Sequence, residues 1–127
     1  MIFLDSSFLI ALFVPNDQWH NDAVRVYNDI KNDKLVISKM VIAETITLLR
    51  LNLETKFIRE IYKNINNLFL VLDDGNYFDK AMKNFIKYDG SISFFDSMYL
   101  YLMKKEGIYE IASFDSDFDG KNVKRVF

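Results

Sequence analysis

Short apolar runs alternate along the chain with longer segments whose apolar residues recur at helical spacing. The runs lack a regular polar alternation, which is typical of strands that are covered on both faces of a sheet. We predict strands at residues 1–4, 35–37, 68–72, 111–114 and 123–127. Between them, apolar positions three and four residues apart predict amphipathic helices. We place these helices at residues 8–14, 19–32, 41–49, 57–65, 77–86 and 94–106.

Local signals support several of these boundaries. Pro15 breaks the chain after the first helix, Ser38 suits an N-cap after the second strand, and Gly107 suits the position just past the last helix. Strands that alternate with helices predict parallel β-α-β units and a sheet with helices on both faces. We therefore predict an α/β fold, a three-layer α/β/α sandwich around a mainly parallel sheet of four to five strands. The length of the chain favours a single domain that comprises residues 1–127.

The composition excludes several kinds of site and several classes of protein. The chain has no Cys, so neither a disulfide framework nor a thiolate metal site is available. No apolar run approaches the roughly 18 residues of a membrane span, and no secretory signal is visible, so we expect a cytoplasmic protein. A net charge of −2 argues against a protein that coats nucleic acid, but it leaves room for an enzyme that acts on nucleic acid.

Four acidic residues stand where predicted strands and helices meet. Asp5 directly follows the first strand and Asp115 the fourth, so in a parallel sheet both lie at the edge where α/β proteins bind ligands. Glu44 lies early in the helix after the second strand, and Asp96 lies in the first turn of the last helix. The pattern predicts that the four acids converge at one edge of the sheet.

Each acid taken singly also has a plain structural interpretation. Asp5, or Ser6 beside it, fits a helix cap, Asp96 suits a helix N-terminus, Glu44 fits a solvent-facing side and Asp115 fits a turn. Together, however, like charges ~4 Å apart repel by about 4 kcal/mol at an effective dielectric near 20. Such a cluster persists only if protons or cations neutralise it. Oxygen ligands without Cys favour Mg²⁺ or Mn²⁺, and these ions activate water for phosphodiester hydrolysis.

Four short motifs carry a resemblance to a known family. They are Asp5-Ser6-Ser7 after the opening strand, Glu44 in its helix, Phe95-Asp96-Ser97 at a helix start, and Ser113-Phe114-Asp115-Ser116-Asp117-Phe118 after the fourth strand. In this order, and over essentially the whole chain, they resemble the PIN-domain pattern. The length and the early Asp resemble its small members, the VapC-type toxins of toxin–antitoxin pairs.

The resemblance implies a metal-dependent ribonuclease. Its catalytic and metal-binding acids would be Asp5, Glu44, Asp96 and Asp115, held with one or two Mg²⁺ or Mn²⁺ ions. Asp117 fits a position that assists or replaces Asp115 at the metal, and Ser6 and Ser113 fit the family's supporting hydroxyls. The resemblance further implies an RNA substrate, a homodimer and a small antitoxin partner, with no membrane association.

Two other interpretations within the same family stay open. The chain could be a PIN nuclease in RNA processing, or a catalytically inactive PIN-like domain that binds only a protein. A haloacid-dehalogenase-like phosphatase would need a second Asp where Ser7 stands, and a response-regulator receiver would need an early acidic pair that is missing. We predict turn and cap roles for Asp73 and Asp74, and a structural role for His20. A row of lysines on one helix suits a solvated face: Lys80, Lys83 and Lys87.

Overall fold

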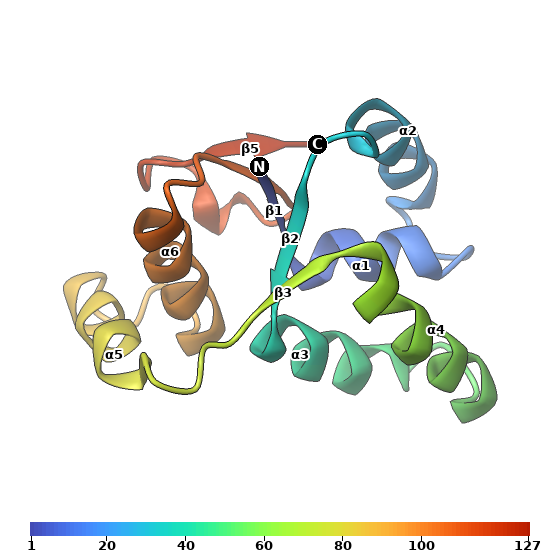
Figure 1. The fold of residues 1–127 in the computed structure, drawn as a ribbon, viewed down its shortest axis with the longest axis horizontal. Helices are drawn as coiled ribbons and strands as arrows, with labels where there is room; N and C mark the ends of the chain where they lie inside the picture. Colours follow the sequence, from blue (N-terminus) through green and yellow to red (C-terminus); the bar gives the residue numbers. More distant parts are fainter.

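The computed structural model describes all residues from Met1 to Phe127 and contains one five-stranded sheet with the strand order β3-β2-β1-β4-β5 (Figure 1). Every neighbouring pair of strands is parallel. The strands are β1 (Ile2–Leu4), β2 (Leu35–Ser38), β3 (Leu70–Leu72), β4 (Glu110–Ala112) and β5 (Lys124–Val126). The predicted α/β fold with a parallel central sheet is confirmed.

Six α-helices cover the two faces of the sheet. They are α1 (Ser6–Phe13), α2 (His20–Ile30), α3 (Lys39–Leu49), α4 (Thr55–Leu68), α5 (Phe78–Lys87) and α6 (Phe94–Glu106). The chain runs from β1 through β2 to β3 in one direction and then crosses back to β4, on the other side of β1. Right-handed crossovers in opposite directions put their helices on opposite faces. Figure 1 accordingly shows α1 to α4 on one side of the strands and α5 and α6 on the other.

The third strand differs from the prediction. Helix α4 continues to Leu68, and Phe69 is its C-cap residue. The strand therefore begins only at Leu70 and not at residue 68. Leu70 is 43% exposed, because β3 is an edge strand and is not covered on both faces. The continuous apolar run therefore combined the last turn of an amphipathic helix with a short edge strand, two elements that a local pattern cannot separate.

The predicted helix ends are largely confirmed. Ser38 caps α3, since its hydroxyl accepts a hydrogen bond from the Val41 N–H at 3.4 Å. Gly107 ends α6 with a left-handed φ of 69°, a conformation that glycine adopts without the clash of a Cβ. Asp73 closes a turn by accepting the Gly75 N–H at 3.0 Å. Asp74 is a cap as predicted, but of the neighbouring helix α3, because its buried carboxylate accepts the Met40 N–H at 2.9 Å.

The core lies between the sheet and both helical layers. Phe3 of β1 and Tyr99 of α6 are fully buried, with ring centroids 5.4 Å apart. The His20 ring lies within 2.8 Å of the Ala11 carbonyl oxygen and links α2 to α1, in keeping with the structural role predicted for it. None of the helices is both long enough and apolar enough to pass through a bilayer.

Candidate metal centre

The candidate site lies where the direction of the chain through the sheet reverses. Strands β1 and β4 are neighbours, yet the helices that follow β1 and those that precede β4 lie on opposite faces of the sheet. Ligand sites in open α/β sheets lie beyond the carboxyl ends of the strands at such a switch point. The register pairs Leu4 with Ala112, so the next residues, Asp5 and Ser113, leave the sheet side by side.

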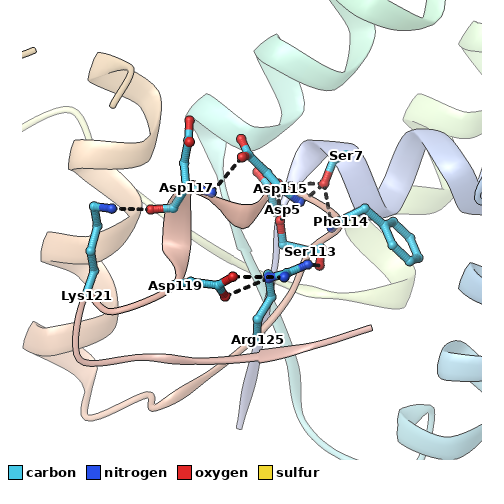
Figure 2. A network of polar contacts seen from close by, with 9 residues as sticks. All are labelled: Asp5, Ser7, Ser113, Phe114, Asp115, Asp117, Asp119, Lys121 and Arg125. Atoms are coloured by element: carbon cyan, nitrogen blue, oxygen red, sulfur yellow. Dashed lines mark hydrogen bonds and ion pairs between the residues drawn. The ribbon is translucent and has the colours of Figure 1, made fainter. Parts of the chain in front are cut away.

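Two serine hydroxyls hold the carboxylate of Asp5. The Ser7 and Ser113 hydroxyls both donate to Asp5 Oδ2, each at 2.8 Å. In turn, Ser7 Oγ accepts the Phe114 N–H at 3.1 Å and Ser113 Oγ accepts the Asp115 N–H at 3.0 Å. Figure 2 shows this network joining the start of α1 to the loop after β4. Asp5 is 2% exposed and forms no N-cap hydrogen bond with α1, so its carboxylate serves the cleft and not the helix end.

Ser7 is the site residue that sequence reasoning missed. The predicted supporting hydroxyl was Ser6, whose side chain instead lies near Glu44 and favours the ionised form of that carboxyl. Residue 7 lies in the first helical turn, two positions after the acid at the strand end. That spacing is compatible with a contact to Asp5, because an N-cap side chain commonly interacts with positions two and three of its helix, but it does not by itself distinguish Ser7 from Ser6.

Three carboxylates come close enough to share one cation. One ligand oxygen each from Asp96, Asp115 and Asp117 lies within 4.8 Å of the other two. Asp96 is buried in the first turn of α6, where its N–H donates to the Ser93 hydroxyl at 3.0 Å. Asp115 is half-buried and accepts the Asp117 N–H at 2.9 Å, while Asp117 itself is exposed. A set of carboxylate oxygens alone is the donor chemistry that suits Mg²⁺ or Mn²⁺.

An ion pair braces the loop that carries Asp115 and Asp117. Arg125 of β5 donates to both carboxylate oxygens of Asp119, at 2.9 and 3.0 Å. Lys121 donates to the main-chain oxygen of Asp117 (Figure 2). A bidentate arginine–carboxylate pair fixes direction as well as distance. The loop is therefore held within the short 3₁₀ helix at Ser116–Phe118 and directly after it.

Glu44 reaches the same cleft from α3. Its Oε1 accepts the hydroxyl of the buried Tyr99 at 3.0 Å, which ties α3 to α6 across the end of the sheet. The cleft has a volume of about 660 Å³ and is also lined by Asp5, Asp96, Asp115 and Asp117. All four predicted acids and Asp117 thus line one cleft, but Asp5 and Glu44 lie beside the closest trio and not within it.

Burial and mutual repulsion favour protonated acids in this cleft. Burial, followed by the charges of Asp5, Asp115 and Glu44, raises the pKa of Asp96 to about 8. Burial also raises the pKa of Asp5 and of Glu44, against the opposing hydrogen bonds from their hydroxyl partners. A divalent cation would relieve the same repulsion without protons. The site can therefore exchange protons for a cation.

Comparison with known proteins places the chain in a family. The family model described as PIN domain matches residues 2–124. The chain belongs to the PIN domain family. The predicted family is confirmed on nearly the whole sequence, and the acids that carried the resemblance lie inside the matched region. A search of curated proteins returned no significant match.

Solved structures resemble this PIN domain along almost its full length. VapC20 of Mycobacterium tuberculosis, described as a toxin that cleaves the sarcin-ricin loop, is 26% identical with a TM-score of 0.90 and covers 99% of this chain and 98% of its own. PAE2754 of Pyrobaculum aerophilum is 21% identical with a TM-score of 0.68 and coverages of 98% and 88%. The FitAB complex bound to a DNA fragment is 18% identical with a TM-score of 0.76 and coverages of 99% and 94%. The last two show the fold alone.

Proposed function

We propose that this PIN domain is a metal-dependent endoribonuclease that hydrolyses RNA phosphodiester bonds and acts as the toxin of a toxin–antitoxin pair. The observation that carries the proposal is the convergence of Asp5, Glu44, Asp96, Asp115 and Asp117 in one cleft at the switch point of the sheet. The likeness to VapC20, described as a toxin that cleaves the sarcin-ricin loop, supports the choice of substrate class.

Asp96, Asp115 and Asp117 would hold Mg²⁺ or Mn²⁺, because their oxygens already lie within 4.8 Å of one another. When bound, such an ion lowers the pKa of a coordinated water and stabilises negative charge on a phosphodiester. Asp5 and Glu44 add two more carboxylates to the cleft, for a second ion or for orienting water. The acids, together with any ions they hold, would activate a water molecule as the nucleophile, in place of the side-chain nucleophile of other hydrolases.

The surrounding hydroxyls hold the acids in place for this role. Ser7 and Ser113 fix Asp5 through Oδ2, and Tyr99 fixes Glu44 through Oε1. Groups that orient metal ligands in this way usually contribute a factor of about 10–100 in affinity or activity. We therefore assign Ser7, Ser113 and Tyr99 as positioning residues, with Ser6 beside Glu44 in the same role.

The test is cleavage of an RNA hairpin and of a single-stranded RNA, each with Mn²⁺ or with EDTA. We expect cutting by the wild type that EDTA stops and that Asp96→Asn reduces by a factor of about 100 or more, beyond the loss typical of a supporting residue. Asp79→Asn is the matched control, because Asp79 is also an Asp in the first turn of a helix but is exposed on α5. RNA that stays intact under all conditions would favour a protein-binding domain, and metal-independent cutting would refute the proposed centre.

The proposed partners follow from the toxin assignment. We expect a homodimer, a small antitoxin protein and a cytoplasmic location. Light scattering on the purified chain tests the dimer. Co-expression with a short neighbouring reading frame, where the gene has one, tests the antitoxin, which should co-purify and suppress cleavage. A nuclease with no such neighbour would instead be one of RNA processing.

A further inference from the structure

Two aromatic rings form part of the wall of the acidic cleft. Trp19 and Phe114 lie with their ring planes 5° apart and their centroids 5.4 Å apart, an offset parallel stack. Trp19 immediately precedes α2, whereas Phe114 follows β4 and directly precedes Asp115. Both residues line the cleft together with the five acids of the candidate centre and Asp17. The fold thus brings a flat aromatic surface next to the candidate metal centre.

The stack is anchored in the core and ends in solvent. Phe114 also stacks on the fully buried Phe8, at 6.1 Å and 23°. Its N–H is held by Ser7, and its ring points away from Asp117 (Figure 2). The main-chain N–H of Trp19 donates to Asp17 at 2.8 Å. Phe114 covers one face of the indole, and Trp19 remains 42% exposed as the outermost ring of the three.

The remaining lining residues explain what this surface suits. The fourteen side chains that line the cleft are acidic, carry a hydroxyl, or are apolar or aromatic. Phosphates are repelled by such a wall unless a cation intervenes, whereas a neutral nucleobase can stack on an exposed aromatic ring. Of the groups in the cleft, the Trp19–Phe114 stack is therefore the one suited to hold a base of single-stranded RNA.

We propose that Trp19, backed by Phe114, is a stacking platform for one unpaired nucleobase of the RNA, next to the phosphodiester at the acidic centre. The proposal rests on the proposed function and adds a binding determinant to it. It also gives the site a preference for RNA whose bases are unpaired, because a base inside a duplex has both faces occupied.

A purely structural role for Trp19 makes a different prediction. If the indole only fastens the start of α2 to Phe114, a leucine of similar apolar character would serve nearly as well. Stacking of a base instead needs an aromatic face. Trp19→Leu and Trp19→Tyr therefore separate the two roles better than Trp19→Ala, which removes both packing and stacking.

The first experiment uses Trp19 as its own probe, because it is the single tryptophan of the chain. The full chain carrying Asp96→Asn is titrated with an uncleaved single-stranded RNA hexamer, an abasic hexamer and a short RNA duplex. We expect the single strand to quench the fluorescence of Trp19 in a saturable manner, and the abasic hexamer and the duplex to quench it little. Equal quenching by all three, or no quenching while a labelled RNA shows binding, would overturn the platform.

The second experiment measures labelled-RNA anisotropy for variants in the same background. Trp19→Leu should weaken binding of the single strand roughly 5- to 100-fold, and Trp19→Tyr should retain most of it. Phe57→Leu is the matched control, because Phe57 is a 50% exposed aromatic residue of α4 that lines a separate, apolar cleft. Unchanged RNA binding in Trp19→Leu would overturn the platform, also where this variant has lost the binding of a protein partner.

The two proposals can fail separately. In a wild-type background, Trp19→Leu should keep the rise in melting temperature caused by Mg²⁺, since no ligand of the centre is changed. Loss of RNA binding with an intact Mg²⁺ response supports the platform even if the chain cuts no RNA. Cleavage of RNA by Trp19→Leu at the wild-type KM would overturn the platform and leave the nuclease proposal standing.

Discussion

Two clefts of the molecule are nearly equal in size and opposite in chemistry. The acidic cleft, at about 660 Å³, lies at the carboxyl edge of the sheet and is lined by six carboxylates, the five of the candidate centre and Asp17. The apolar cleft, at about 680 Å³, is lined mainly by hydrophobic side chains of the α1 end and α4. These hydrophobic residues are Phe13, Leu53, Phe57, Ile61 and Leu68.

The difference lies in what holds each cleft in shape. Around the acidic cleft, Ser7, Ser93, Ser113 and Tyr99 fix carboxylates or their main chain by hydrogen bonds. The apolar cleft is shaped by side-chain packing, which responds to neither pH nor divalent ions. Buried like charges lower the stability of the metal-free fold, so the acidic cleft should respond to both. Mutations in the two clefts should separate these behaviours.

The largest effect is expected from Asp96→Asn. The variant should lose RNA cleavage by a factor of about 100 or more, because it removes a member of the closest carboxylate trio. The metal-free variant should also melt higher than the wild type near neutral pH, since residue 96 no longer has to take up a proton when the chain folds. Nuclease assays and calorimetry with and without Mg²⁺ measure both. A Mg²⁺-induced shift as large as that of the wild type would contradict a shared ion.

The second effect concerns pH. The pKa of Asp96 is about 8 in the folded protein against the ordinary 3.8, so the folded state binds this proton more tightly. The resulting stability is fully present below about pH 4 and is lost as pH rises toward about 8, on the order of 5 kcal/mol if Asp96 acted alone. Urea unfolding in EDTA at about pH 5 and about pH 9 measures the loss.

Mg²⁺ should reverse this trend, because it replaces the proton. Its stabilisation should be small at about pH 5 and larger at about pH 9. Asp96→Asn should flatten the pH dependence, whereas Phe57→Ala in the apolar cleft should keep it. If the free energy of unfolding of Asp96→Asn depends on pH as steeply as that of the wild type, the pH dependence arises from other groups.

A smaller loss is expected from Ser113→Ala. The hydroxyl joins Asp5 to the Asp115 main chain, so its removal frees both and leaves a buried carboxylate short of a donor. Activity should fall about 10- to 100-fold, and the free energy of unfolding by about 1–3 kcal/mol. Cleavage kinetics and urea titration test this, with the exposed Ser91→Ala as control. Wild-type kcat in Ser113→Ala would refute a positioning role.

The smallest effect is expected from Phe57→Ala. Phe57 is half-exposed on the apolar cleft, so its truncation should lower the free energy of unfolding by about 1 kcal/mol or less. RNA cleavage by the isolated chain and the Mg²⁺-induced rise in melting temperature should stay at wild-type values. A change in either would show that the two clefts are coupled.

Sequence patterns predicted where Asp5 and Asp115 lie, because the end of a strand is visible in the local sequence. Asp5 and Asp115 each follow an apolar run, and a parallel sheet brings such ends to one edge. The choice between Ser6 and Ser7 was beyond the pattern, since two adjacent hydroxyls differ only in their direction around the first helical turn. The stack of Trp19 on Phe114 was likewise unpredictable, because it joins residues 95 positions apart whose neighbourhood depends on the loop after β4.

The sequence by itself determined the element order, the parallel sheet and the edge at which its acids meet. These follow from local hydrophobic period and from the limited handedness of strand crossovers. Tertiary structure alone decided where α4 ends and β3 begins, that Asp74 caps α3, and that Ser7 holds Asp5. It also placed Trp19 beside the acids. The physical reason is that hydrogen bonds and ring contacts depend on directions in space between chain segments, which no local period encodes.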